Sequence, residues 1–313
     1  MYNSAIKEEF IKYITEGVSF AKFCEALFNE LEPYENEWGA DFCTVTAEQF
    51  TPAINNIAGV RKETRRRKTS VLKKYVEWCI NVAKIPGARE DALSPTFDGL
   101  GAVKKKMVAS PAHLQKYLDE VYTKEEKNSV DNIYRCYHWL AFGGIAEEDI
   151  FKIKNSDVDL TNMVVKWKGN EAPIYREAVP AFKQCLNSVS FLFYHPGYEN
   201  PAPIQRIPGD TLMRSIRKTN DAMRFRTLVS DRWREHPTKD GLRLSYLRVW
   251  LSGLFYRLYE GEKMGIPPDF LAVATMCISE RNYKTALPPD VHIKRVVNQY
   301  KKDYEQWKIA FLC

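Results

Sequence analysis

The stretch that decides the fold runs from Tyr134 to Pro180 and reads YRCYHWLAFGGIAEEDIFKIKNSDVDLTNMVVKWKGNEAPIYREAVP. Its first part carries apolar residues at helical spacing, up to Gly143-Gly144. Paired glycines predict the end of a helix, because glycine loses more backbone entropy on folding than any other residue. Residues 145–153 then predict a second short helix, with acidic residues in its first turn, where they favour the positive end of the helix dipole.

The second part of this stretch predicts a β-hairpin. Asp157-Val158-Asp159 leads into a turn at Thr161-Asn162, and a strand is expected over residues 163–167. Gly169-Asn170 predicts the hairpin turn, and residues 174–179 predict the return strand. We therefore expect a small antiparallel sheet within a helical domain.

This order of elements resembles the start of the catalytic domain of tyrosine recombinases, the phage-integrase family. There the pattern reads roughly T-G-L-R-x-x-E-L-x-x-L-x-x-x-D-I-D, followed by a hairpin that carries a lysine. Gly143-Gly144-Ile145-Ala146 stands where the family has T-G-L-R, and Asp157-Val158-Asp159 stands where it has D-I-D. The resemblance therefore places Ala146 at the position of the first catalytic arginine.

Residues 241–283 extend the resemblance. The family's H-x-L-R motif enters a buried helix, and here Ser245 takes the place of the histidine while Arg248 aligns with the second arginine. Farther along, Thr275 stands in for a histidine or tryptophan, and Tyr283 stands at the position of the nucleophile. On the hairpin, Lys168 is the preferred counterpart of the family's catalytic lysine.

Several alternatives remain open for these residues. Lys166 is the other candidate for the hairpin lysine, and strand lysines also serve simply to protect an edge. Arg248 could be a buried arginine paired with Asp157 or Asp159. Tyr283 could be a surface aromatic, since the chain contains seventeen tyrosines.

The resemblance also implies how these losses affect the chemistry. In the family, a tyrosine hydroxyl attacks a DNA phosphodiester and forms a covalent 3′-phosphotyrosine. Arginines and histidine-type donors stabilise the charge that builds on the phosphate oxygens, and losing one such donor costs on the order of a hundredfold in rate. Because Ala146, Ser245 and Thr275 replace three of them, we expect strand cleavage to be impaired or absent.

A basic stretch lies in the N-terminal third of the chain. Residues 61–74 contain eight lysines and arginines against Glu63, whereas the whole chain carries a net charge of +6. Solvated helix faces usually alternate in sign, and this one does not. Clustered cations release counterions when they contact phosphates, so we predict a DNA-binding surface. Its residues are Arg61, Lys62, Arg65, Arg66, Arg67, Lys68, Lys73 and Lys74.

The chain divides into three predicted segments and is expected to be mainly α-helical. Residues 1–93 predict a SAM-like helical bundle, similar to the core-binding domain of the same recombinases. Residues 94–109 predict a linker that contacts DNA through Lys104, Lys105 and Lys106. Residues 110–313 predict the catalytic-like domain, with a C-terminal helix that resembles the family's docking segment and implies a homo-oligomer.

Within the bundle, residues 6–31 predict one or two amphipathic helices, followed by a polar loop that contains Pro33 and Gly39. Thr46 and Gln49 predict the N-terminal cap of the next helix. The basic stretch then runs into apolar residues at helical spacing.

The composition excludes several classes of protein. The sequence contains no run of about eighteen apolar residues, so we expect no membrane span. The N-terminal residues also lack the apolar region of a signal peptide. Seven cysteines without a C-x-x-C pair, and five dispersed histidines, predict a reducing compartment and neither a metal nor a cofactor. These features predict a cytoplasmic, nucleoid-associated protein.

Three functions compete at this point. The first is a double-stranded DNA-binding protein on a catalytically degenerate recombinase scaffold, associated with a mobile element. The second is an active site-specific recombinase that uses Tyr283. The third is a helical scaffold whose basic face binds an acidic protein or RNA.

Overall fold

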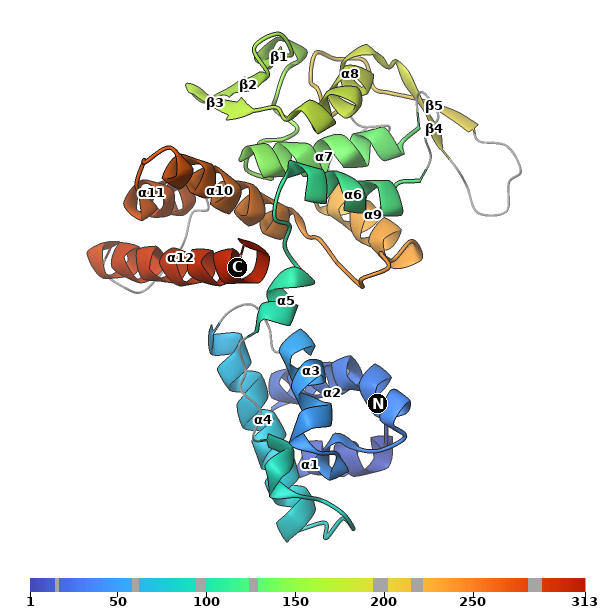
Figure 1. Cartoon of the computed structure of the whole chain (residues 1–313). Coiled ribbons are helices and arrows are strands. Elements are labelled where there is room, and N and C mark those ends of the chain that lie inside the picture. Colours follow the sequence, from blue (N-terminus) through green and yellow to red (C-terminus); the bar gives the residue numbers. More distant parts are fainter. Residues whose placement is uncertain are drawn as a thin grey trace. The chain divides into compact units, whose positions relative to one another are not determined.

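The computed structural model describes residues 1–14, 17–57, 62–93, 99–123, 129–193, 202–214, 222–280 and 289–312. The chain forms two compact units (Figure 1). Unit 1 comprises Met1–Lys105 together with Glu305–Cys313, and unit 2 comprises Lys106–Tyr304. Among the helices in these ranges, none combines the length and the apolar character that crossing a membrane requires.

Unit 1 is the helical bundle that the sequence predicted. Its first two helices are separate, so residues 6–31 belong to two helices rather than one. Two short 3-10 turns, Phe42–Thr44 and Glu90–Leu93, connect the longer elements. The helices are α1 (Ser4–Ile14), α2 (Val18–Trp38), α3 (Ala47–Ile57), α4 (Lys62–Asn81) and α5 (Leu100–Lys104).

The helix boundaries in unit 1 follow local chemistry, with one exception. Thr46 and Gln49 form the predicted cap of α3, because the Gln49 N–H donates to Thr46 Oγ1 (3.3 Å) and the Thr46 N–H donates to Gln49 Oε1 (3.1 Å). The predicted loop at Pro33 was wrong, since α2 continues through the proline and ends at Gly39. Gly39 has φ = 63°, the left-handed conformation common after a helix.

Aromatic side chains fill the core of unit 1. Phe10, Phe28, Phe42 and Tyr75 are fully buried. The Tyr75 ring lies 5.0 Å from that of Phe10 and 5.1 Å from those of Phe28 and Phe42, centroid to centroid. Because Tyr75 belongs to α4, this aromatic contact attaches α4 to the rest of the bundle.

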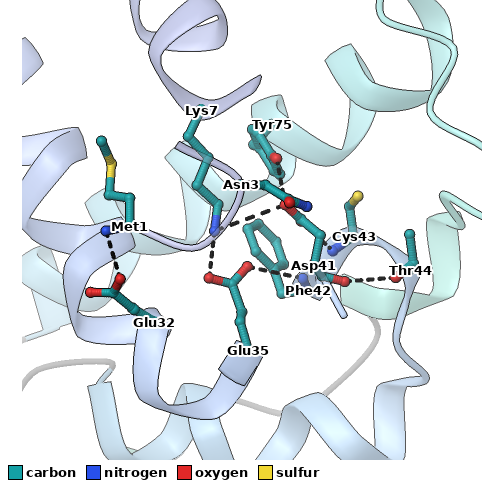
Figure 2. Close-up of polar contacts among 10 residues, drawn as sticks. All are labelled: Met1, Asn3, Lys7, Glu32, Glu35, Asp41, Phe42, Cys43, Thr44 and Tyr75. Atoms are coloured by element: carbon teal, nitrogen blue, oxygen red, sulfur yellow. Dashed lines mark hydrogen bonds and ion pairs between the residues drawn. The ribbon is translucent and has the colours of Figure 1, made fainter. Parts of the chain in front are cut away.

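A buried ionic cluster joins the same elements (Figure 2). We call Lys7, Glu35, Asp41 and Tyr75 the Lys7 cluster; Lys7 forms an ion pair with Glu35, and its Nζ lies 3.9 Å from Asp41 Oδ2. The Tyr75 hydroxyl donates to Asp41 Oδ2 at 2.9 Å, and the Phe42 N–H donates to Glu35 Oε1 at 3.1 Å. The cluster thus ties α1, α2 and α4 to the turn at Phe42–Thr44.

Unit 2 is also mainly helical and contains two small antiparallel sheets (Figure 1). The first sheet has the order β1-β2-β3, with β1 (Val158–Asp159), β2 (Val164–Trp167) and β3 (Asn170–Pro173). The second pairs β4 (Ser190–Phe193) with β5 (Ala202–Gln205). The helices are α6 (Pro111–Val121), α7 (Asp131–Gly143), α8 (Val179–Asn187), α9 (Ala222–Glu235), α10 (Tyr246–Lys263), α11 (Phe270–Glu280) and α12 (Pro289–Leu312), whose last residues belong to unit 1.

The close packing of α10 against the end of α7 organises unit 2. Gly144, with φ = 105°, ends α7 as predicted. A Cβ placed on Gly253 of α10 would lie only 1.9 Å from the Phe142 carbonyl oxygen, so the two helices approach at a point where a side chain does not fit. Side chains of α10 then satisfy the carbonyls that the helix end leaves free: Trp250 Nε1 donates to Gly144 O (2.9 Å) and Tyr246 Oη donates to Ile145 O (2.8 Å).

Two predicted elements of unit 2 were wrong. Residues 146–152 form turns instead of a helix, and the buried Asp149 carboxylate accepts hydrogen bonds from the hairpin. The return strand is β3 and not residues 174–179, because Lys168 (φ = 50°) and Gly169 (φ = 76°) make a two-residue turn. Trp167 therefore pairs directly with Asn170, and the strand ends at Pro173.

The segment for which we predicted a linker contains regular structure. Residues 94–98 lie outside the described part of the chain, while Leu100–Lys104 forms α5 in unit 1. Ala102 and Val103 of this helix are fully buried, which explains why it packs as part of the bundle.

Candidate nucleic-acid interface and remnant of a catalytic site

One side of α4 is cationic and exposed. The opposite stripe packs into the core through Val71, Leu72 and Tyr75, so residues on the far side of the helix face solvent. Arg66, Lys73 and Lys74 are exposed, and within the described ranges they form no ion pair. We call these three residues the α4 cationic face.

The α4 cationic face borders an open hollow of about 580 Å³. Among the described residues that line this hollow, Glu77 is the one acidic side chain. The Thr69 hydroxyl on its wall donates to Arg65 O at 2.9 Å. Guanidinium, ammonium and hydroxyl groups are the side-chain donors that commonly contact phosphate oxygens of DNA. The lining residues are Arg65, Arg66, Thr69, Ser70, Lys73, Lys74 and Glu77.

Lys68, which we predicted to contact DNA, instead holds the bundle together. Only 6% of its surface is exposed, its Nζ donates to Ile57 O at 2.7 Å, and it forms an ion pair with Glu30. The position lies three, four and seven residues before buried residues of α4, so it faces the core. Lys68 therefore does not contribute to an exposed surface.

The remaining cations of this stretch have distinct surroundings. Arg65 Nη1 donates to Gln306 Oε1 at 3.3 Å, and the guanidinium of Arg67 lies 4.1 Å from the ring centroid of Phe23. Arg61 lies outside the described residues, and Lys62 is the first residue of α4, with its side chain also outside them.

The three lysines that follow α5 differ in exposure. Lys104 is exposed. Lys105 is half-buried, and its Nζ donates to Tyr34 Oη at 3.2 Å. Lys106 is half-buried and begins unit 2.

In unit 2, the predicted catalytic lysine is bound by a carboxylate. Lys168 Nζ lies 2.5 Å from Asp149 Oδ2, and Trp167 Nε1 donates to the same oxygen at 3.1 Å. Burial alone would raise the pKa of Asp149, but hydrogen bonds from two lysines and Trp167 outweigh burial and lower that pKa. Lys166, the alternative, lies 3.7 Å from Asp159 Oδ2. Both candidate lysines are therefore ion-paired.

A carboxylate lies next to Ala146, the residue that the sequence comparison placed at the position of the family's first arginine. The next residue, Glu147, forms a bidentate pair with Arg226 of α9, with Oε1 3.0 Å from Nε and Oε2 2.5 Å from Nη2. It also accepts a hydrogen bond from the Tyr137 hydroxyl. Glu147 thereby connects α9 to the chain that follows α7.

Sequence reasoning missed a second arginine near this corner. Arg257 of α10 donates from Nη1 to Phe142 O at 2.5 Å, and burial lowers its pKa. The sequence offered one indication of this contact. Arg257 lies four residues after Gly253, so both residues share the face of α10 that approaches α7. The hydrogen bond gives Arg257 the role of a cap for α7.

The other catalytic-like positions lie near the ends of α10 and α11. Ser245 precedes α10 and is exposed, with no capping hydrogen bond from its side chain, and Arg248 is half-buried in the first turn. Thr275 is exposed, and its hydroxyl donates to Leu271 O at 2.9 Å. Tyr283 lies outside the described residues.

Comparison with known proteins gives a match to the N-terminal part of unit 1. Residues 1–81 match the family model described as MrpR, N-terminal core-binding domain. Residues 1–81 are therefore similar to a core-binding domain. The match ends where α4 ends, so the core-binding domain includes the whole α4 cationic face. This match agrees with the predicted N-terminal core-binding bundle.

Three solved structures are similar over most of their length, at low identity. XerA recombinase is 12% identical, with 96% of this chain and 93% of that chain covered and a TM-score of 0.38. The Tn1549 transposon integrase in complex with a circular intermediate DNA is similar in two structures. One is 13% identical, covers 93% of this chain and 98% of that chain, and has a TM-score of 0.32. The other is 14% identical, covers 91% and 96%, and has a TM-score of 0.31. A comparison with curated protein sequences gave no match.

Proposed function

We propose that this protein binds double-stranded DNA through its core-binding domain and does not cleave it efficiently. The observation that carries the proposal is the α4 cationic face, where Arg66, Lys73 and Lys74 are exposed and, in the described ranges, lack carboxylate partners. An unpaired cation can exchange its counterions for a phosphate without first breaking an ion pair. In this proposal the three cations contact phosphates, and such contacts position a duplex without selecting its sequence.

The state of the catalytic-like residues supports the second half of the proposal. Lys168 is paired with Asp149, and Glu147 places a carboxylate beside Ala146. Because Glu147 is itself paired with Arg226, this corner holds a closed ion pair and not the free donors that stabilise the charge building on a phosphate during cleavage. Ser245 and Thr275 stand in place of histidine-type residues. Together with Ala146 and the ion-paired Lys168, they make four of the six catalytic-like positions that differ from the family's pattern or are already bound to a carboxylate; the other two are Arg248 and Tyr283.

The finer parts of the proposal follow from the resemblance of the sequence to phage integrases. We propose that the protein is associated with a mobile element and acts in the cytoplasm, on the nucleoid. The resemblance of its last helix to a docking segment supports a homo-oligomer.

A salt titration tests the DNA-binding proposal. Affinity for a fluorescein-labelled duplex is measured by anisotropy from about 50 to 300 mM salt, where each phosphate contact contributes about −0.9 to the slope of log Kobs against log salt concentration. The triple variant Arg66→Gln, Lys73→Gln, Lys74→Gln should have a slope shallower by about 2 to 3. Lys12→Gln, at an exposed position of α1, is the control and should retain the wild-type slope. Binding that is absent, or that does not depend on salt, would exclude the proposal.

A nicked suicide duplex tests the loss of chemistry. The full chain is incubated with the duplex and run on a denaturing gel, and we expect no covalent protein–DNA band. A covalent band that disappears in Tyr283→Phe would instead establish an active recombinase.

A further inference from the structure

Four exposed lysines around the first sheet of unit 2 are ion-paired with three carboxylates. Lys152 Nζ lies 2.9 Å from Asp149 Oδ1, and Lys154 Nζ lies 3.4 Å from Asp210 Oδ2. The two hairpin lysines are paired in the same way with Asp149 and Asp159. A phosphate would have to displace a carboxylate at each of these sites, so this surface is poorly suited to bind a polyanion.

The outer side of α12 differs from that surface. Lys294, Arg295 and Lys302 are exposed, and in the described part of the chain they form no ion pair. They flank Asn298 on one side of the helix, at the spacing of neighbouring turns. We call Lys294, Arg295 and Lys302 the α12 cationic face; it extends over roughly 12 Å of helix, at 1.5 Å per residue.

Buried contacts fix which side of α12 points outward. Tyr304 is fully buried, with its ring 5.6 Å from those of Phe255 and Phe270, and its hydroxyl donates to Glu262 Oε2 at 2.6 Å. Lys301 Nζ lies 6.0 Å from the Phe270 ring centroid, at the border of the packed side. Residues two positions apart point to nearly opposite sides of a helix. Because Tyr304 packs against α10 and α11, Lys302 and the rest of the α12 cationic face point away from them.

We propose that the α12 cationic face is a second site of contact with the phosphate backbone of duplex DNA. The inference rests on the proposed function, because it assumes that duplex DNA is the partner of this protein. The charge selects this partner: three unpaired cations within 12 Å match a duplex that carries one phosphate per roughly 1.7 Å of its axis. The same face of a second copy is a poor partner, since like charges would oppose each other across the contact.

The test compares charge removal on two helices of the full chain. The variant Lys294→Gln, Arg295→Gln, Lys302→Gln should bind a labelled duplex about 10- to 100-fold more weakly at ~0.1 M salt, and its salt slope should fall by about 2 to 3. Lys308→Gln is the matched control, because Lys308 lies on the same helix but is paired with Glu305 at 3.1 Å. Far-ultraviolet circular dichroism checks the fold, and the single variant Lys302→Gln, with an expected slope change of about 1, gives a milder test.

The outcomes separate this inference from the proposed function. If the variant on α4 weakens binding while the variant on α12 keeps the wild-type slope, the α12 contact is excluded and the proposed function stands. If the variant on α12 changes only the mass measured by light scattering, this face is a protein interface and the inference is overturned. A preference for single-stranded RNA over duplex DNA that the α12 substitutions remove would also overturn it. If the wild-type protein does not bind duplex DNA, both proposals fail.

Discussion

Two lysines of one helix show how position decides the role of a charge. Lys68 and Lys74 belong to the same basic stretch, yet Lys68 is buried and paired with the exposed Glu30, whereas Lys74 is exposed. The difference follows from helical geometry, since Lys68 shares a side of α4 with Leu72 and Tyr75. A buried lysine keeps its charge only if hydrogen-bonding partners replace water, and Ile57 O and the Glu30 carboxylate do so.

Replacing each lysine should separate stability from DNA binding. Lys68→Ala removes a buried hydrogen bond and leaves the Ile57 carbonyl without its partner, so we expect a loss of about 1 to 3 kcal/mol in the unfolding free energy. Lys74→Ala should change that free energy by less than about 0.5 kcal/mol and weaken DNA binding. Urea unfolding and duplex anisotropy measure the two effects. Equal stabilities of the two variants would contradict the role given to Lys68.

Glu35 is a second residue whose surroundings change its behaviour. Burial raises the pKa of Glu35 to about 7, although the ion pair with Lys7 acts in the opposite direction. The folded state therefore binds a proton at pH values where the unfolded chain, with an ordinary carboxyl pKa near 4.5, has released it. By linkage, the stability of unit 1 decreases as pH rises from about 4.5 to about 7.

This linkage gives a pH-dependent prediction. We expect the unfolding free energy to be about 1 to 3 kcal/mol lower at pH 8 than at pH 5 through Glu35, since one pKa unit corresponds to about 1.4 kcal/mol. Glu35→Gln cannot titrate, so its stability should vary less across the same range. Urea unfolding at several pH values measures the difference between the two proteins. Parallel pH profiles would show that Glu35 does not titrate in this range.

At the scale of elements, the contact between α7 and α10 sets the geometry of unit 2. Gly253 permits a close approach, and Trp250 and Tyr246 then satisfy the end of α7. The same contact brings the first turn of α10, with Arg248, to the chain that follows Gly144. The arrangement of the corner that follows Gly144 therefore depends on backbone packing between α7 and α10.

Gly253→Ala should disrupt this contact. The new methyl group would overlap the Phe142 carbonyl, and backbone cannot move away as easily as the end of a side chain, so we expect a loss of about 3 kcal/mol or more, or failure to fold. Gly209→Ala is the control, because its Cβ would meet only the Arg214 side chain, at 3.8 Å. Thermal unfolding followed by circular dichroism compares the two variants. A Gly253→Ala protein as stable as wild type would show that α10 does not pack this closely.

Across the whole molecule, sequence reasoning succeeded where local chemistry decides the structure. The glycine pair at the end of α7, the cap at Thr46 and the basic face of α4 all follow from short-range rules. It failed where distant residues decide, as at residues 146–152, where contacts with the hairpin replace a helix. The pairing of Lys168 with Asp149 joins residues nineteen positions apart on different elements, and no periodicity reveals it.

The last prediction concerns the combined effect of the α4 and α12 cationic faces on DNA binding. If both contact DNA phosphates, the substitutions on α4 and on α12 should each reduce the salt slope by about 2 to 3, and the six-residue variant should reduce it by about 5. Additivity is expected because each phosphate contact releases its counterions independently. The anisotropy titration of wild type, both triple variants and their combination measures this. A combined slope no shallower than that of the α4 variant alone would mean that only the core-binding domain holds the duplex.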